Sequence, residues 1–306
     1  MTTSPIEFIP GPPTARPDWL KVRVPADAGN YAEIKEIMRG LSLHTVCQEA
    51  RCPNVGECWG HRTATFMILG DVCTRACRYC AVKSGNPYEL DDSEPRHVAE
   101  AVQQMGLKHA VVTSVDRDDL PGFGSAQFAQ TIRYIRALNP DCAIEVLTPD
   151  FQADEAALWT VMDAGPDIFN HNIETVERVF TRVRPGRSDY RKSLTVLKKA
   201  KEMDPTCLTK SGLMVGLGEE PTEVHQTMRD LREQSVDILT VGQYLRPTAK
   251  HVPIDRYVHP DEFAEYKTYG RELGFAHVES GPLVRSSYHA HEQSELLRGR
   301  RAGAGA

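Results

Sequence analysis

From residue 65 onward, short apolar runs alternate with longer stretches in which apolar residues recur at helical spacing. The apolar runs have the length of β-strands and lie at residues 65–69, 109–113, 143–147, 167–170, 208–214 and 237–241. The amphipathic stretches predict helices at residues 95–105, 125–138, 153–163, 189–202, 220–233 and 260–273. Repeated strand–helix units favour a parallel sheet that can curl toward a barrel, because their crossovers are right-handed. The sequence therefore predicts an α/β protein whose functional face lies at the carboxyl ends of the strands.

The pattern differs on either side of this regular part. Six prolines within residues 1–29 are too many for a helix interior or a central strand, so we expect an extended arm there. A short helix is predicted from about Tyr31 to Gly40. The basic, Gly/Ala-rich residues 298–306 predict a disordered tail. We divide the chain into an N-terminal region, a barrel and a C-terminal segment, at residues 1–62, 63–280 and 281–306.

Composition limits the function classes. The chain has 306 residues, of which 41% are hydrophobic, so it can bury a sizeable core. A net charge of −6 gives no general attraction to nucleic acid or to anionic membranes. No apolar run reaches the roughly 18 residues of a membrane-spanning helix, and the N-terminus lacks a signal-peptide pattern. We therefore expect a soluble, cytoplasmic protein that binds no nucleic acid and has no membrane span, in a reducing compartment that preserves thiolates.

Six of the eight cysteines form two closely spaced triads. The first is Cys47, Cys52 and Cys58, and the second is Cys73, Cys77 and Cys80. Cubane iron–sulfur clusters normally take four cysteine thiolates, so a triad that holds one leaves an iron free for a substrate, a cofactor or a weaker protein ligand. The triads therefore predict sites of chemistry, with the second one directly after the first predicted strand.

Other interpretations of the cysteines are weaker. A disulfide framework does not fit a chain of this size without a signal segment. Structural zinc is the main competitor, and His44 or His61 could complete a zinc site at the first triad, although only Cys77 and Cys80 form the usual C-x2-C pair. Cys142 and Cys207 lie in strand-like segments and are expected to be buried thiols.

Polar residues follow the predicted strands and should gather at one mouth. They are Thr113, Ser114 and the acidic residues up to Asp119, then Thr148 and Asp150, then Asn170 to Glu174, with Lys210 and Ser211 inside the fifth strand and Gln243 and Tyr244 after the sixth. Any one of them could instead be an ordinary loop-forming residue.

The second triad, with Tyr79 just before Cys80, resembles the radical S-adenosylmethionine superfamily. The resemblance implies a partial six-unit (β/α) barrel of the TIM type and a 4Fe-4S cluster whose open iron chelates S-adenosylmethionine. It also implies reductive cleavage of that cofactor to a 5′-deoxyadenosyl radical. We expect the cofactor to be bound by residues at the mouth, namely Tyr79, Thr113, Ser114, Asn172, Glu174 and Lys210.

More specific motifs resemble the lipoyl synthase family. They are residues 47–59, 70–80, 115–121, 169–175, 209–219, 244–248 and the Arg-Ser-Ser-Tyr segment at residues 285–288. The resemblance runs from about Trp19 to His289, and the first triad together with Arg-Ser-Ser-Tyr is not shared by other radical enzymes. Family members often have Asp-Gly-Gly where this chain has Gly122, Phe123 and Gly124, and the segment 184–190 varies.

The family resemblance implies sulfur insertion at C6 and C8 of an octanoyl chain that is amide-linked to a lysine of a lipoyl carrier protein. The first triad then holds a second 4Fe-4S cluster, in the N-terminal extension, which is the sulfur donor and is consumed. An exchangeable serine completes it, assigned to Ser287 with Ser286 as the alternative. Arg285 and Tyr288 set the approach of that serine, and the C-terminal segment closes the barrel.

The same resemblance implies protein partners. They are octanoylated carriers (the glycine cleavage H protein and the lipoyl domains of 2-oxoacid dehydrogenases), an electron donor such as flavodoxin or ferredoxin, and an iron–sulfur carrier that renews the consumed cluster. Two other functions remain open from the residues alone. The first cluster could be an electron relay, as in radical dehydrogenases, or the chain could be a zinc-stabilised adaptor without chemistry.

Overall fold

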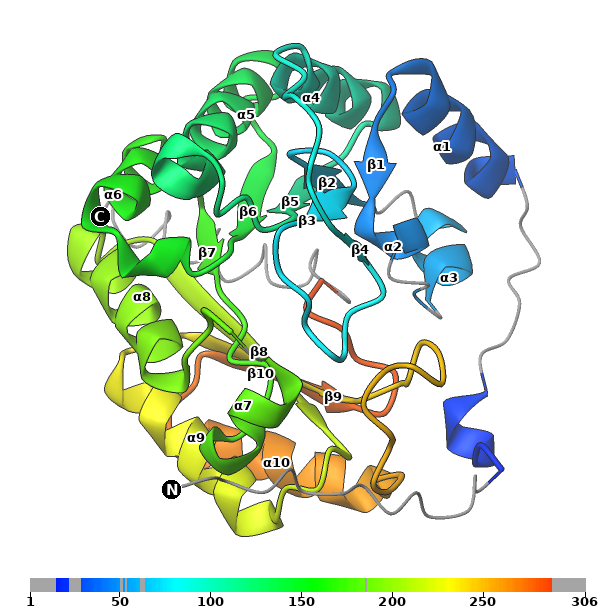
Figure 1. Ribbon diagram of the computed structural model, residues 1–306, viewed down its shortest axis with the longest axis vertical. Coiled ribbons are helices and arrows are strands. Elements are labelled where there is room, and N and C mark those ends of the chain that lie inside the picture. The colour runs from blue at the N-terminus through cyan, green and yellow to red at the C-terminus, as the bar shows by residue number, and fades with distance from the viewer. Residues whose placement is uncertain are drawn as a thin grey trace.

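The computed structural model describes residues 15–21, 29–49, 52, 54–60, 64–184 and 186–287, and its centre is one open, curved sheet (Figure 1). The strands lie side by side in the order β1 (His44–Thr45), β2 (Thr65–Ile68), β5 (His109–Ser114), β6 (Ala143–Leu147), β7 (Ile168–Asn170), β8 (Leu208–Val215), β9 (Ile238–Gln243) and β10 (His277–Gly281). Neighbouring strands from β2 to β10 are parallel, and β1 is antiparallel to β2. Within the described residues β1 and β10 are the two edges, so the structure is a partial barrel, as predicted.

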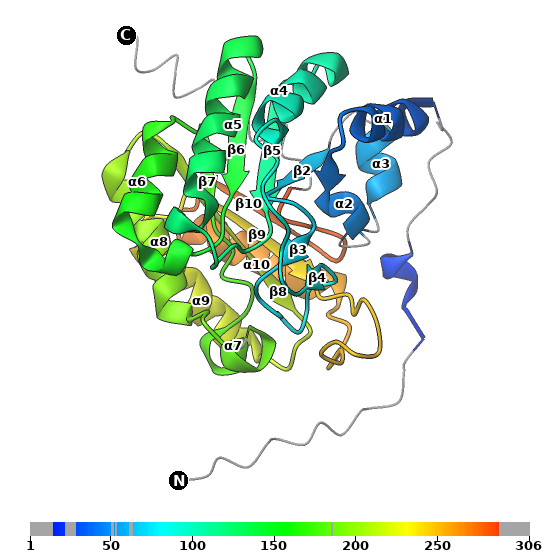
Figure 2. The same cartoon turned by 45° about the horizontal axis from the view of Figure 1, so that its top comes forward.

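Helices connect the strands and cover the outer side of the sheet (Figures 1 and 2). The described helices are α1 (Gly29–Gly40), α2 (Val46–Glu49), α3 (Val55–Gly60), α4 (Glu94–Met105), α5 (Ser125–Leu138), α6 (Glu155–Asp163), α7 (Glu177–Val183), α8 (Tyr190–Met203), α9 (Pro221–Glu233) and α10 (Pro260–Glu272). Of these, α4, α5, α6, α8, α9 and α10 form the outer layer. Three short 3-10 helices lie at Asp18–Leu20, Pro121–Gly124 and Phe151–Ala153, and β3 (Val72–Cys73) and β4 (Lys83–Ser84) form a separate two-stranded sheet.

Local sequence explains where these helices begin and end. Asp154 and Asp189 cap α6 and α8, because their carboxylates accept hydrogen bonds from the main-chain N–H groups of Ala157 and Lys192, each at 2.8 Å. Such acceptors satisfy N–H groups that have no partner inside the helix. α4 ends at Gly106, whose φ of 63° lies in the left-handed region that glycine adopts without strain.

The six predicted strands and the six predicted barrel helices are all present. The short elements α2, α3, β1, β3, β4 and the 3-10 helices were not predicted, and neither were β10 and α7. β10 has only Val278 buried among otherwise half-exposed residues, so the hydrophobic alternation that marks a strand is weak there. The seven-residue helix α7 lies in the long connection between β7 and α8, and it is too short to give a clear helical period.

Most of the N-terminal arm and all of the C-terminal tail after Ser287 lie outside the described residues, so the extended arm and the disordered tail remain predictions. Where the arm is described, Leu20 is fully buried and the Trp19 ring contacts the His259 ring at 5.2 Å between centroids. Among the helices that the structure describes, none is long and apolar enough to cross a membrane. The division of the chain into three regions also remains a prediction.

The interior of the barrel contains a buried ion pair. Lys210 in β8 lies 2.9 Å from the carboxylate of Glu145 in β6, and both side chains are fully buried. Asn170 donates a hydrogen bond to the same carboxylate at 2.8 Å, and His109 lies 3.3 Å from it. Burial alone would raise the pKa of Glu145, but Lys210 and His109 lower it to about 2. The carboxylate is therefore charged, and Lys210 is its cationic partner.

Replacing Lys210 by Met should leave this buried charge without its main partner. We expect the Lys210→Met protein to lose about 3–5 kcal/mol of unfolding free energy, measured by urea unfolding of the cluster-free protein. Arg191→Met breaks an exposed ion pair with Glu177 and should cost no more than about 1 kcal/mol. Equal losses in the two proteins would contradict the importance of the buried pair.

Candidate active site

The loop that carries the second triad leaves the carboxyl end of β2 and lies beside three other segments (Figure 2). Cys73 is in β3, and Cys77 and Cys80 follow in the turn before β4. Main-chain hydrogen bonds join the loop to the ends of β5 and α7 and to the segment between β9 and α10: Thr74 N to Asp116 O, Arg78 N to Val183 O and Val252 N to Arg78 O, each at 2.9 Å. The loop therefore has a fixed position over the barrel.

The second-triad sulfurs are arranged to accept hydrogen bonds. Cys73 Sγ accepts from the main-chain N–H groups of Arg75 at 3.4 Å and Asp116 at 3.3 Å. Burial raises the pKa of the Cys73 thiol to about 11 and that of the Cys80 thiol to about 12, and the N–H donors act against this effect. Without a bound cation these groups are thiols, whereas iron would bind them as thiolates.

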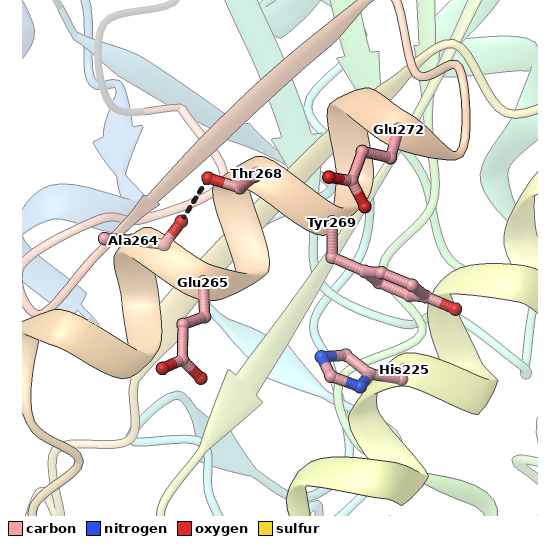
Figure 3. Close-up of a pocket in the computed structure, with 6 residues that line it drawn as sticks. All are labelled: His225, Ala264, Glu265, Thr268, Tyr269 and Glu272. Atoms are coloured by element: carbon pink, nitrogen blue, oxygen red, sulfur yellow. Dashed lines mark hydrogen bonds between the residues drawn. The ribbon is translucent and has the colours of Figure 1, made fainter.

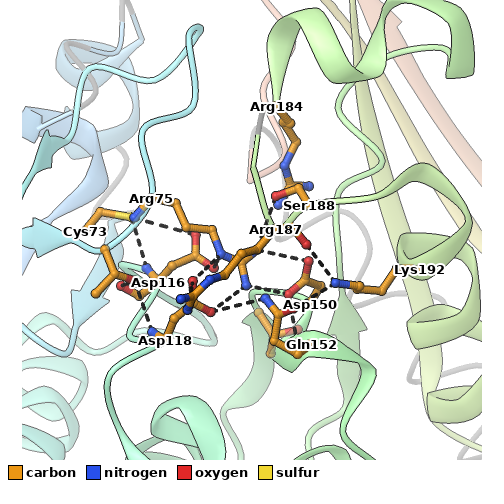
Figure 4. A network of polar contacts seen from close by, with 12 residues as sticks. Cys73, Arg75, Asp116, Asp118, Asp150, Gln152, Arg184, Arg187, Ser188 and Lys192 are labelled. Atoms are coloured by element: carbon orange, nitrogen blue, oxygen red, sulfur yellow. Dashed lines mark hydrogen bonds and ion pairs between the residues drawn. The ribbon is translucent and has the colours of Figure 1, made fainter. Parts of the chain in front are cut away.

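Arg75 lies inside the triad loop and pairs with carboxylates from two barrel strands (Figure 4). Its guanidinium, with 4% of the side chain exposed, lies 2.8 Å from Asp118, 2.7 Å from Asp150 and 3.2 Å from Asp116. Because Asp116 and Asp118 follow β5 and Asp150 follows β6, the pairs tie the loop to both strand ends. Arg75 was not predicted. The sequence contained a signal for it, because the loop carries a cation and the segment after the following strand is rich in acidic residues.

A second polar group surrounds Cys77. Glu174 has a raised pKa because burial outweighs the nearby Arg184 guanidinium and hydrogen bonding from Tyr79 and Asn172. Burial would lower the pKa of Arg184, yet Tyr79, Glu174 and Cys77 raise it, so Arg184 is a cation beside the triad. The predicted residues Tyr79, Asn172 and Glu174 thus lie together at Cys77. Arg184 was missed, because it falls in a segment that varies in the family.

Thr113 and Ser114 end β5, next to β2. Their main chains pair with Met67 and Ile68, from which the triad loop starts. Thr113 Oγ1 donates to Leu147 O at 2.8 Å, so this hydroxyl already has a partner. Ser114 Oγ is buried and has no hydrogen-bond partner among the described residues.

Further buried polar atoms without a hydrogen bond lie in the same region of the described structure. They are His171 Nε2, Asn172 Oδ1 and Arg184 Nε. Unpaired buried donors and acceptors are costly, and most proteins have few. A polar ligand at the mouth that offers a carboxylate, an amine and hydroxyls would satisfy such groups, so the residues present fit S-adenosylmethionine.

Lys210, also predicted to bind the cofactor, lies elsewhere. It is the third residue of β8 and pairs with Glu145 in the barrel interior, at the level of His109 at the start of β5. The structure does not bring it to the group around Cys77. Gln243 likewise has protein partners, because its side chain bonds to main-chain atoms of Val215 and Val258.

The first triad is built on two short helices beside the amino end of β2. Cys47 is in α2, Cys58 is in α3, and Cys52 N donates to Cys47 O at 3.0 Å. Burial, followed by the neighbouring Cys52 and Cys47, raises the pKa of the Cys58 thiol to about 12. Burial also raises the pKa of Cys47, although hydrogen bonding from the Thr65 main chain and the Trp59 side chain acts in the opposite direction. The three thiols are thus electrostatic neighbours.

The C-terminal segment, residues 282–287, reaches both triad regions. Thr65 Oγ1 donates to Ser287 Oγ at 2.8 Å, and the Thr65 main chain interacts with the Cys47 thiol. Asn172 Nδ2 donates to Ser286 Oγ, also at 2.8 Å. Ser287 therefore lies on the side of the first triad, and Ser286 on the side of the second.

Arg285 completes this arrangement next to the first triad. It is a charge neighbour of Cys52 and lowers the pKa of that thiol, although burial raises it overall. Burial also lowers the pKa of Arg285 itself. The last predicted residue of the motif, Tyr288, lies outside the described residues.

No three His, Cys, Asp or Glu side chains converge as ligands of a single metal ion in the described part of the chain. His44, the candidate zinc ligand that the structure describes, faces the carboxylate of Glu94, and His61 is not among the described residues. In a cubane cluster each thiolate binds a different iron.

Comparison with known proteins agrees with this geometry. The radical SAM superfamily model matches residues 67–231, and the N-terminal domain of lipoyl synthase of the radical SAM family matches residues 12–52. A curated lipoyl synthase of Rubrobacter xylanophilus is 66% identical over 92% of this chain and 88% of that protein. The chain belongs to the lipoyl synthase family. A lipoyl synthase of Shouchella clausii, at 58% identity over 91% of this chain and 90% of its own, supports the same assignment.

Solved structures support the fold of this lipoyl synthase family member. Methylornithine synthase superposes with a TM-score of 0.54 at 14% identity, over 81% of this chain and 82% of that one. Streptococcus suis SuiB bound to S-adenosylmethionine gives a TM-score of 0.57 at 12% identity, over 83% and 61%. At such low identity these similarities show the fold alone.

A surface pocket of about 370 Å³ lies on the outer helices α9 and α10, where the centroids of the tilted His225 and Tyr269 rings are 4.3 Å apart (Figure 3). No triad residue lines it. The candidate active site is therefore the region between the two triads and not this pocket.

The position of the C-terminal segment depends on Gly242 in β9. A Cβ atom there would lie 2.2 Å from the main-chain oxygen of Val284, and a main-chain group cannot move aside as a flexible side chain can. Gly242→Ala should displace residues 282–287 and increase their amide hydrogen exchange at least several-fold. Gly40→Ala, which meets no atom within 4 Å, is the control. Unchanged exchange in the Gly242→Ala protein would refute this packing.

Proposed function

We propose that this protein catalyses the lipoyl synthase reaction, in which sulfur is inserted at C6 and C8 of an octanoyl chain on a lysine of a carrier protein. The observation that best supports the proposal is the C-terminal segment: one pair of adjacent serines contacts Thr65 beside the first triad and Asn172 beside the second. Radical formation and sulfur donation need two cluster sites within reach of one substrate chain, and this segment joins two such sites.

The second triad has the residues that radical generation requires. Cys73, Cys77 and Cys80 would hold the 4Fe-4S cluster that binds S-adenosylmethionine. When it and S-adenosylmethionine are bound, they supply a 5′-deoxyadenosyl radical. Arg184 is a buried cation suited to the cofactor's carboxylate, and the unpaired Ser114 hydroxyl is suited to its polar groups. Burial of these groups excludes water from a site where a radical must not be quenched.

Asn172 and Glu174 fit the hydroxyl groups of the ribose, because an amide oxygen and a carboxylate both accept hydrogen bonds. Tyr79 lies beside Glu174 and is proposed to contact the adenine. Thr113 is proposed to support cofactor binding indirectly, because its main chain pairs with the strand from which the triad loop starts. Lys210 is also proposed to act indirectly, through its ion pair in the barrel interior.

Cys47, Cys52 and Cys58 are proposed to hold a second 4Fe-4S cluster as the sulfur donor. Ser287 is proposed as its fourth ligand, because its hydroxyl is the one that Thr65 holds at the first triad. Hydroxyl coordination is exchangeable, which suits a cluster that must release sulfur. The Arg285 guanidinium offsets the negative charge of the Cys52 thiolate, and Tyr288 is proposed to help place the serine.

Membership of the family supports lipoyl carrier proteins as substrates in general. We propose the glycine cleavage H protein and the lipoyl domains of 2-oxoacid dehydrogenases as the specific carriers. Flavodoxin or ferredoxin is proposed as the electron donor, and an iron–sulfur carrier as the source of cluster renewal. The cytoplasm, where thiolate-bound iron is protected from oxidation, is the proposed location.

Removing one thiolate of the second triad should abolish radical formation. We expect the anaerobically reconstituted Cys77→Ala protein to form no 5′-deoxyadenosine from S-adenosylmethionine, because a cluster held by two thiolates is not retained. Cys142→Ala also removes a buried thiol, but one that directly precedes β6 and belongs to neither triad, and it should keep full activity. Undiminished 5′-deoxyadenosine formation by Cys77→Ala would rule out the assigned role.

The first triad should be needed for sulfur insertion and not for cofactor cleavage. We expect Cys52→Ala to form 5′-deoxyadenosine with an octanoylated lipoyl domain but no lipoyl product. The Ser287→Ala protein should still bind the cluster of the first triad but make far less product, whereas Ser287→Cys should retain an iron ligand. Reconstitution with isotopically labelled sulfide, followed by mass spectrometry of the target lysine, measures the donor directly. An unlabelled product would show that the cluster is an electron relay.

A further inference from the structure

Asp116 places a carboxylate against a sulfur of the second triad. Its Oδ2 lies 3.8 Å from Cys73 Sγ, and its own main-chain N–H donates to the same sulfur at 3.3 Å. Asp116 also interacts electrostatically with the Cys77 thiol. One residue thus brings both a negative charge and a hydrogen-bond donor to the edge of the proposed cluster.

The carboxylate of Asp116 cannot turn away from the triad. Arg75 Nε lies 3.2 Å from its Oδ1, and the same guanidinium is bound by Asp118 and Asp150 (Figure 4). Three carboxylates therefore share one buried guanidinium, and Arg184 is a second cation that acts on Asp116. Arg187 reaches only Asp118, at 3.7 Å, and its side chain is 65% exposed.

The arrangement is costly for stability alone. Asp116 Oδ1 is buried and accepts no hydrogen bond from any described residue, although it lies in the field of Arg75. When iron converts Cys73 to a thiolate, the carboxylate faces a second negative charge at close range. Burial also raises the pKa of Asp116, and the Arg75 and Arg184 guanidinium groups act against both effects.

We propose that Asp116 lowers the reduction potential of the 4Fe-4S cluster bound by the second triad. This inference rests on the proposed function of that triad. The cluster becomes more negative by one charge on reduction, so a fixed carboxylate beside Cys73 disfavours the reduced form. The N–H donors of Arg75 and Asp116 act in the opposite direction and stabilise the charged sulfur.

A low potential has a direct chemical use. A one-electron donor of the flavin or iron–sulfur class reduces the cluster, and that electron then passes to the sulfonium of S-adenosylmethionine. One carbon–sulfur bond breaks, giving neutral methionine and a 5′-deoxyadenosyl radical, so charge and electrons balance. The lower the potential of the cluster, the larger the driving force for this transfer. Asp116 is accordingly a positioning and electrostatic residue that does not need to touch the cofactor.

The test is a potentiometric titration of the cluster bound by the second triad, followed by electron paramagnetic resonance and carried out without S-adenosylmethionine. All proteins carry Cys47→Ala, Cys52→Ala and Cys58→Ala, so that only the second triad binds a cluster. Asp116→Asn removes the charge and keeps the main-chain donor to Cys73. At a fixed solution potential we expect the ratio of reduced to oxidised cluster to rise about tenfold, a shift of about 59 mV to less negative potential for one electron.

Asp119→Asn is the matched control, because it removes one charge from the same loop at a 40% exposed side chain that pairs with Arg117. It should leave the potential nearly unchanged, and Asp116→Glu should restore most of the original value. A shift in Asp116→Asn no larger than in Asp119→Asn, or one toward more negative potential, overturns the proposal.

Loading is measured separately as iron and sulfide per protein. If the parent protein with an intact second triad binds no reducible cluster, the proposed function itself fails. If that protein loads, and Asp116→Asn and Asp116→Ser do not load while Asp116→Glu does, the carboxylate is needed for binding and the proposal about potential is wrong. A loaded variant of any yield gives a potential, since the midpoint does not depend on the loaded fraction.

Discussion

The buried guanidinium of Arg75 is the interaction on which the arrangement of the candidate active site depends. It lies within the second-triad loop and is bound by carboxylates that follow two neighbouring strands of the parallel sheet. In a parallel sheet all strands end at the same edge, so residues distant in sequence converge there. Arg75 uses that convergence, together with the main-chain hydrogen bonds of the loop, to hold the loop over the barrel. The same clamp holds Asp116 against Cys73, so the position of the loop and the electrostatics of its sulfurs are linked.

The open edge of the barrel determines where the cysteines of the first triad can lie. β1 and β10 are not joined within the described residues, and the C-terminal segment after β10 lies along β9, where Gly242 permits main-chain contact with Val284. This segment also accepts a hydrogen bond from Asn54 at Leu283 O, at 2.7 Å, next to Cys52. The two cysteine triads come from opposite ends of β2, and residues near the C-terminus connect their surroundings.

The sequence predicted much of the fold because the barrel strands are buried on both sides. Phe66, Val112 and Val146, for example, are fully buried in strands that the apolar runs marked. The prediction failed where packing does not require apolar residues. β10 is an edge strand with polar side chains, and α7 is a short turn of helix in a long connection. The two triads were visible in the sequence because the binding of a cluster by thiolates requires cysteine itself, at close spacing.

The sequence by itself therefore determined the fold class and the family, and it indicated the cysteines that we propose as cluster ligands, since each depends on residue type and local spacing. Only the tertiary structure decided which polar residues meet. It brought Asn172, Glu174 and Tyr79 to Cys77, added Arg75, Arg184 and Asp116, and placed Lys210 in the barrel interior with Glu145. It also separated the two adjacent serines, with Ser287 toward Cys47 and Ser286 toward Asn172. The physical reason is that contacts between strand ends and loops join residues dozens to hundreds of positions apart, and their geometry depends on how the whole sheet curves.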